Sequence, residues 1–126
     1  MPQLATLEAI DPGDEMDVTL RVGELRVRCF AVIAPAPLAV GEVYRVAFTA
    51  SVDEPRITEV PDEVVPSLRH TGAAYGYRGA GRIVGDALDA DGVIIEEIWR
   101  PGDFAYLDGK MVTFELDRLD VEFLSD

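Results

Sequence analysis

The sequence holds a single histidine, His70, and a serine, Ser67, stands shortly before it. A serine nucleophile needs a facing histidine as its general base and an acid that orients the histidine. The prolines Pro55, Pro61 and Pro66 interrupt the surrounding segment, and proline breaks the hydrogen-bonded ladder of a strand. No regular element would then fix the two side chains relative to each other, so we expect His70 to be an exposed loop residue.

Paired carboxylates recur along the chain, and Glu96 and Glu97 form one such pair. Adjacent residues of a strand point to opposite faces of the sheet, so these two cannot form an acid/base dyad by themselves. The sequence offers no other set of nucleophile, base and acid. We therefore expect the protein not to be an enzyme.

The segment Asp89–Gly92 resembles the centre of a helix–loop–helix calcium loop. Such a loop needs a carboxylate at its first position and a bidentate glutamate at its twelfth, and here those positions fall on Ala87 and Ile98. Zinc sites are built from several Cys and His ligands, and the chain has one of each. We predict a β-turn at Asp89–Gly92, and neither a metal nor another cofactor.

The glycines Gly79, Gly81 and Gly85 are similar to a dinucleotide-binding fingerprint, but their spacing is one residue too long. The fingerprint also requires a helix after the glycines, whereas the residues that follow have the pattern of a strand. Glycines in a strand commonly permit bulges and close backbone approach. We predict that Gly79 and Gly81 lie in a strand, that Gly85 directly follows it, and that these glycines bind no nucleotide.

Three arginines of the first half share one face of a predicted hairpin. Arg21 falls opposite Arg26, and Arg28 lies two residues further along the same face. Like charges directly opposite each other destabilise a strand pair, so an anion should lie nearby. We expect an Asp or Glu of an adjacent strand, and a bound anion is the alternative.

Aromatic and arginine side chains of the second half form a weaker candidate for a ligand-binding surface. Rings offer faces on which sugars or bases stack, and arginine adds hydrogen bonds and charge. Ordinary packing in the core explains the same residues and is favoured. The candidates are Tyr75, Tyr77, Arg78, Arg82, Trp99 and Arg100.

Acidic residues outnumber basic ones, with 24 Asp and Glu against 11 Lys and Arg, for a formal net charge of -13 and a pI near 4.3. Both halves of the chain share this acidity. Such a field repels phosphate backbones and anionic lipids, and it attracts cationic partners. We expect neither nucleic acid nor a membrane as a partner, and a basic protein fits the charge best.

Cys29 is the only cysteine, so no intrachain disulfide can form. This suits a reducing compartment. The first residues have neither a basic stretch nor a long apolar one, so we find no signal peptide. No apolar run approaches the length of a membrane span. We expect the protein to be cytoplasmic, and the sequence does not distinguish a monomer from a homodimer.

The clearest local structure is a hairpin over residues 18–33. Apolar and polar residues alternate on both sides of Gly23-Glu24, and a two-residue gap that begins with glycine suits a type II′ turn. The pairing would bury one set of side chains on a single face. They are Val18, Leu20, Val22, Leu25, Val27 and Cys29.

Short β-prone runs separated by turn residues recur elsewhere, and helical periodicity is almost absent. The runs are Leu4–Ile10, Glu42–Ser51, Tyr75–Val84, Val93–Trp99, Phe104–Leu107, Val112–Leu116 and Leu119–Phe123. The alternation slips at Asp117-Arg118, which a bulge or corner explains. The pattern predicts an all-β, mainly antiparallel fold: a single small barrel, OB-like or Greek-key, with a β-sandwich as second choice.

Length favours one domain over residues 1–126. Residues 38–48 resemble residues 106–116, which suggests two similar β halves, 3–52 and 73–124. A proline-rich crossover at 53–72 would join them, with at most one short helix near 62–70.

The first functional hypothesis is a non-enzymatic acidic module that binds or inhibits a basic protein partner. The alternative is a β-barrel that binds a small ligand or carbohydrate through the aromatic and arginine surface. A third, an OB-type nucleic-acid binder, fits the fold but conflicts with the charge.

Overall fold

The structure is a computed structural model that describes residues 2–33, 37–51, 56–72, 75–96 and 102–124. Within these residues it contains strands and one 3-10 turn, and no α-helix. The described residues include no helix that is long and apolar enough to cross a membrane.

The strands follow the chain in short antiparallel steps, as the alternation predicted. Their bounds are β1 (Gln3–Asp11), β2 (Asp14–Val22), β3 (Leu25–Ile33), β4 (Val43–Ser51), β5 (Thr58–Glu59), β6 (Ser67–His70), β7 (Tyr77–Val84), β8 (Ala87–Ala90), β9 (Val93–Glu96), β10 (Met111–Leu116) and β11 (Arg118–Phe123), with the 3-10 turn η1 at Ala105–Leu107.

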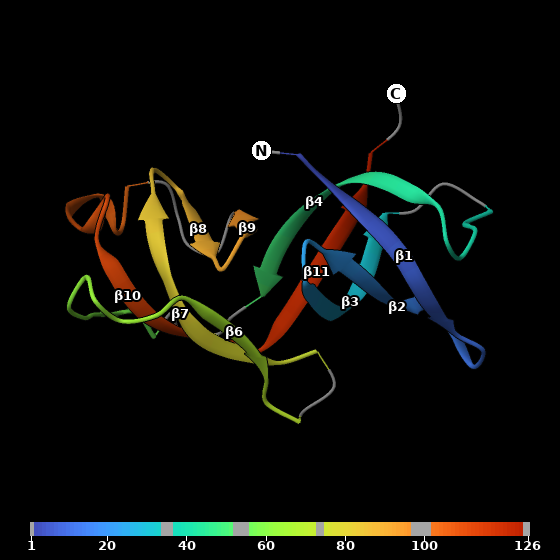
Figure 1. Cartoon of the computed structure of the whole chain (residues 1–126), viewed down its shortest axis with the longest axis horizontal. Helices are drawn as coiled ribbons and strands as arrows, with labels where there is room; N and C mark the ends of the chain where they lie inside the picture. The colour runs from blue at the N-terminus through green and yellow to red at the C-terminus, as the bar shows by residue number, and fades with distance from the viewer. Residues whose placement is uncertain (1, 34–36, 52–55, 73–74, 97–101, 125–126) are drawn as a thin grey trace.

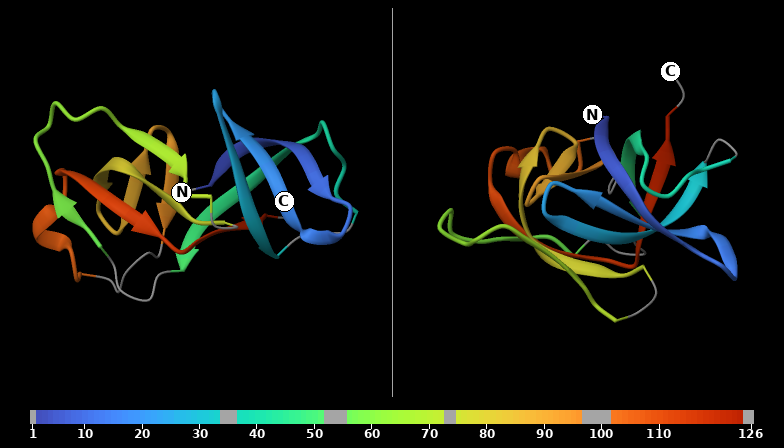
Figure 2. Two further views of the ribbon diagram at one scale, coloured as in Figure 1. Left: turned by 90° about the horizontal axis from the view of Figure 1, so that it is seen from below. Right: turned by 45° about the vertical axis from the view of Figure 1, so that its right-hand side comes forward.

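Five strands close into a small barrel in the order β1-β2-β3-β11-β4, because β4 pairs back with β1. The remaining strands continue from β4 as β9-β8-β7-β10-β5, and β6 also pairs with β7. Figures 1 and 2 show the barrel on one side and the second group of strands on the other. The predicted all-β barrel is confirmed. Two pairings, β3 with β11 and β4 with β9, are parallel.

The predicted hairpin is confirmed in its register. Val18 pairs with Cys29, and Leu20 pairs with Val27. Gly23 has φ 60°, which the first central position of a type II′ turn requires. The predicted face is buried, and Leu25 at its end is partly buried.

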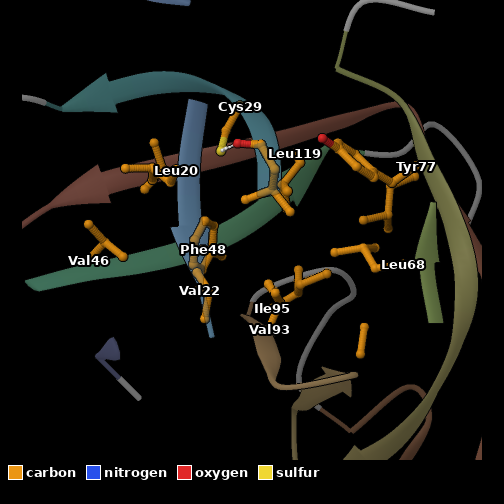
Figure 3. Packing of buried hydrophobic residues seen from close by; sticks show 14 of the residues in the cluster. Leu20, Val22, Cys29, Val46, Phe48, Leu68, Tyr77, Val93, Ile95 and Leu119 are labelled. Carbon is orange, nitrogen blue, oxygen red and sulfur yellow. Dashed lines mark hydrogen bonds between the residues drawn. The ribbon is translucent and has the colours of Figure 1, made fainter. Parts of the chain in front are cut away.

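One apolar core runs through both groups of strands. Figure 3 shows Phe48 of the barrel close to Ile95 of β9. Cys29 lies in this core without any exposed surface, and its thiol donates to the carbonyl of Val27 at 3.6 Å. Burial raises the pKa of the Cys29 thiol, so the reactive thiolate is disfavoured.

The prediction of at most one short helix near 62–70 agrees with the structure, in which a turn at Asp62-Glu63 precedes strand β6, and β6 pairs with β7. Two details differ from the sequence-based predictions. His70 is exposed, but it lies in this strand and not in a loop. The predicted strand Phe104–Leu107 is the 3-10 turn, because only Leu107 reaches the core and the backbone turns back on itself there.

Two further predictions concern the second half of the chain. The bend at Asp117 separates β10 from β11, and the chain changes its strand partners there. Strand β9 is described to Glu96, and the rest of the predicted run lies outside the described residues.

The same three-strand pairing occurs in both predicted halves. The paired core residues are Leu7, Leu20 and Val27 in the first half and Ile83, Leu88 and Ile95 in the second. In each half the fourth strand then pairs with the first, as β4 with β1 and β10 with β7. The pattern agrees with a duplication, which stays a prediction.

Glycines let β7 approach its neighbours closely. A Cβ atom at Gly79 would overlap the backbone carbonyl of Ser67 in β6, with the carbonyl carbon 2.7 Å away. A Cβ atom at Gly81 would lie 2.5 Å from the carbonyl oxygen of Asp89 in β8. These glycines therefore lie in a strand, as predicted, and their role is spatial.

Candidate functional site

Two hollows meet at the turn between β8 and β9, and we call them together the acidic groove. Their volumes are about 350 Å³ and about 470 Å³, and they share Asp91 and Gly92. The first is further lined by Asp62, Val64, Pro66, Arg82, Val84, Asp89 and Met111. The second is further lined by Val22, Gly23, Glu24 and Leu25. The groove thus joins the β2–β3 turn, the β8–β9 turn and the segment before β6.

The β8–β9 turn at the centre of the groove is a tight two-residue connection. Asp91 has φ 54° and Gly92 has φ 95°, the positive values that a type I′ hairpin turn demands. Asp89 fixes the turn, because its Oδ1 accepts a hydrogen bond from the Gly92 amide at 3.0 Å. The turn predicted over Asp89–Gly92 is present at Asp91-Gly92, whereas Asp89 and Ala90 end strand β8. Asp91 is exposed at its tip.

Carboxylates outnumber cations around the groove. Glu24, Asp62, Asp89 and Asp91 line it together with one arginine, Arg82. The Arg82 guanidinium donates to the Gly109 carbonyl at 2.7 Å and lies 3.5 Å from Asp62. This leaves the groove with an excess of negative charge.

Apolar side chains lie between these carboxylates. Val84 is 50% exposed, and Val22, Leu25 and Val64 line the hollows beside it. A surface of this kind suits a ligand with both cationic and aliphatic groups, since lysine and arginine carry apolar stems below their charges. Among the residues that the structure describes, no group of three or more Asp, Glu, His or Cys could hold a metal ion.

The arginines of the first hairpin have a partner on the adjacent strand. Arg21 and Arg26 are directly opposite each other. Glu8 of β1 lies between them, 2.7 Å from Nε of Arg26 and 3.6 Å from Nε of Arg21. The acidic neighbour expected for this pair is therefore Glu8.

Arg28 makes a separate cluster with Asp17 and Tyr75. Its Nε donates to both oxygens of Asp17, at 2.9 Å and 3.0 Å, and its Nη2 also bonds to this carboxylate. The guanidinium lies over the Tyr75 ring, 5.5 Å from its centroid. Asp17 is buried, so the pair fixes the guanidinium on the outer face of the barrel.

A second pair of the same kind lies beside the first. Arg118 binds Asp120, which is buried, through Nε at 2.6 Å and Nη2 at 3.2 Å. Its guanidinium covers the ring of Phe30 at 4.7 Å, and Phe30 meets Tyr75 edge to face at 5.8 Å. Guanidinium groups thus already occupy ring faces that a sugar would need.

Tyr77 connects the second group of strands to the barrel. Its hydroxyl accepts from the Arg28 amide at 2.7 Å and donates to the Arg28 carbonyl at 3.0 Å. Strand β11 pairs with β3 from Phe30 onward. The tyrosine hydroxyl therefore provides the hydrogen bonds for the backbone of Arg28, just before that pairing begins. Burial raises the pKa of Tyr77 to about 12, which keeps the hydroxyl protonated.

Of the remaining predicted site residues, the structure describes Arg78 and Arg82, and these lie at opposite ends of β7. Arg78 is exposed on a different face of β7 from Tyr77. Arg82 lines the acidic groove, while Trp99 and Arg100 lie outside the described residues. The predicted aromatic and arginine surface is therefore divided among separate places.

Sequence reasoning missed the carboxylates that matter most here. Glu24 and Asp62 come into the groove only through strand topology, which no local pattern encodes. Asp17 and Asp120 were not among the predicted site residues. The sequence signal for each was an arginine close to it on the same or the adjacent strand, and knowledge of the complete strand register would have shown the pairing.

The Asp17–Arg28 pair makes a testable contribution to the free energy of unfolding, and this contribution depends on pH. Hydrogen bonds from Arg28 hold the pKa of Asp17 below its ordinary value, against the desolvation that raises it. A lowered folded-state pKa gives stability that is present above the unfolded pKa, about 4, and is lost as the pH falls through the folded pKa. Asp17→Asn removes this contribution.

We expect the Asp17→Asn variant to be less stable than the wild type at neutral pH, with a gap that narrows as the pH falls below about 4. Urea unfolding at neutral pH and at several acidic values measures the gap. The exposed Glu15→Gln change on the same strand serves as the control. A gap that stays constant over this range would contradict the linkage.

Comparison with known proteins gives one match. A family model described as Uncharacterised conserved protein UCP019853 matches residues 1–124. No curated protein and no solved structure matches the chain.

Proposed function

The chain belongs to this family of uncharacterised conserved proteins, and on that premise we propose that it is a non-enzymatic module that binds a cationic segment of a protein partner in the acidic groove. One observation carries the proposal: the two hollows meeting at Asp91-Gly92 combine an excess of carboxylates with apolar walls. Where the bound segment is the working surface of the partner, occupation of the groove would inhibit that partner.

The charge of the whole chain favours the encounter. A net charge of -13 steers cationic surfaces toward the protein and raises the association rate at low salt. The groove would then select among them. Lysine or arginine stems would lie against Val64 and Val84, while their charged ends reach Asp62 and Asp91.

The other two functions have less support. A carbohydrate or small-ligand platform needs free ring faces, and Arg28 and Arg118 stack on Tyr75 and Phe30. OB-type binding of a nucleic acid agrees with a five-stranded barrel, but it needs a basic groove, and the groove here is acidic. We also keep the cytoplasm as the expected location, since the chain has a single, buried cysteine.

The proposal is tested with a short fluorescein-labelled peptide of alternating lysine and leucine, followed by fluorescence anisotropy at low salt. The groove variant is Glu24→Gln/Asp62→Asn/Asp91→Asn. We expect its Kd to rise about tenfold, which corresponds to ~1.4 kcal/mol. Asparagine is a suitable replacement at Asp91 because it tolerates positive φ.

A matched control separates the groove from the general charge. The variant Glu15→Gln/Glu42→Gln/Glu122→Gln loses the same charge at positions outside both hollows, and its Kd should change by no more than about twofold. Equal losses in the two variants would show that only the net charge attracts the peptide, and would refute the groove as the binding site.

A further inference from the structure

Two exposed arginines of neighbouring strands face each other. Arg69 of β6 pairs directly with Arg78 of β7, and both side chains are exposed. Neither forms an ion pair with another described residue. Every other arginine that the structure describes has an ion pair or another interaction: Arg21, Arg26, Arg28, Arg45, Arg56, Arg82 and Arg118.

The arrangement costs stability unless an anion neutralises it. Directly opposite residues of an antiparallel pair have Cβ atoms ~5 Å apart, and like charges at that distance repel. The chain has a second pair of this kind, Arg21 and Arg26, and there it supplies Glu8 within 3.6 Å of both. No described residue supplies such an anion for Arg69 and Arg78, and an external anion could take its place.

An acidic residue, Glu115, also lies opposite Arg78, but on its other side. Glu115 of β10 is the cross-strand neighbour of Arg78 on the side away from Arg69. Its carboxylate lies 3.9 Å from Arg56, a third exposed arginine. In Figure 1, β6 and β10 lie on either side of β7, so Arg69, Arg78 and Glu115 form a row across three strands. Glu115 therefore does not lie between the two arginines, and no described residue forms an ion pair with either of them.

We propose that Arg69 and Arg78 bind a phosphate group. Two planar guanidinium forks side by side can donate to several oxygens of one tetrahedral anion. A phosphate close to its dianionic form also neutralises both positive charges, whereas a carboxylate neutralises one. The ligand carries a single phosphate group, because the net charge of -13 of the protein would repel a longer run of phosphates. This site is separate from the acidic groove and does not rest on the proposed function.

The test follows the arginine side-chain Nε–Hε signals of the 15N-labelled protein by NMR at neutral pH and constant ionic strength. Inorganic phosphate, phosphoserine and acetate are the probes. We expect saturable shifts of Arg69 and Arg78 with millimolar Kd for at least one phosphate probe, and at least a fivefold weaker response to acetate. The lower of the two Kd values, for inorganic phosphate or for phosphoserine, shows whether the site prefers free phosphate or a phosphate monoester.

Two variants make the result specific. Arg69→Gln should raise the phosphate Kd at least tenfold, and without phosphate it should melt at the wild-type temperature or slightly higher because a repulsion is removed. Arg26→Gln, in the pair that Glu8 bridges, should leave the Kd within twofold. The proposal is overturned by shifts that do not saturate, by acetate binding as tightly as phosphate, or by equal effects of the two variants.

Discussion

Replacing Gly79 with alanine is expected to destabilise the fold by more than ~3 kcal/mol, a large part of the stability of a small domain. The added Cβ atom would overlap the backbone of Ser67, with the carbonyl carbon only 2.7 Å away. A backbone atom in a paired strand cannot rotate aside, unlike the end of a flexible side chain. Relief would require β6 to separate from β7, with loss of the four cross-strand pairs at Ser67–His70.

Urea denaturation followed by tryptophan fluorescence and circular dichroism measures this loss. Gly13→Ala is the matched control, because the nearest atom to its new Cβ is a side-chain oxygen of Asp11 at 3.3 Å, which can move. That variant should stay within about 0.5–1 kcal/mol of the wild type. A Gly79→Ala protein as stable as Gly13→Ala would show that β6 does not lie against β7 as the structure has it.

Tyr77→Phe is expected to cost ~2–4 kcal/mol although it removes a single oxygen. The hydroxyl satisfies both the amide and the carbonyl of Arg28. Without it, both groups would remain partly buried and unpaired, and each unsatisfied group costs ~1–3 kcal/mol. The ring itself stays, so the packing of the core is preserved and the loss reports on the hydrogen bonds.

Tyr106→Phe provides the control, since Tyr106 is 75% exposed and its hydroxyl meets water. Its unfolding free energy should stay within about 0.5 kcal/mol of the wild type. Amide hydrogen exchange adds a local readout: the Arg28 amide should exchange faster in Tyr77→Phe than in the wild type. Unchanged exchange at Arg28 together with unchanged stability would contradict the role of this contact.

The first hairpin could be predicted in detail because every signal that defines it is local. Apolar residues alternate on both sides of Gly23, and the two-residue turn leaves one register in which Val22 meets Leu25. The β8–β9 turn at Asp91-Gly92 followed for the same reason. In both cases the residue types required by the turn and the burial pattern of the strands agree.

The segment near 62–70 was harder because its local signals are weak. Pro61 suggested the start of a helical turn, but the structure of Ser67–His70 is decided by pairing with β7. That pairing depends on Gly79, which stands well beyond β6 in the chain. Strand partners at such separations are a property of the fold and not of the segment.

The candidate sites show the same contrast between local signals and contacts between distant segments. The arginine pair of the first hairpin was predictable, since its register follows from a tight turn. The acidic groove was not, because Glu24, Asp62 and Asp91 come from three separate connections. Tyr75 and Tyr77 were predicted to belong to a ligand-binding surface, whereas Tyr77 is buried against Arg28. Alternation places Tyr77 on a face of β7, but only the fold shows what covers that face.

The most direct test of the proposed function locates the bound cationic peptide on the protein. Backbone amide signals of the 15N-labelled protein would be followed during titration with the unlabelled lysine–leucine peptide at low and at high salt. We predict saturable shifts that centre on three segments, 22–25, 62–66 and 89–92, and that weaken as salt is added. Shifts that spread evenly over exposed acidic residues such as Glu15 and Glu42, or that avoid all three segments, would contradict binding in the acidic groove.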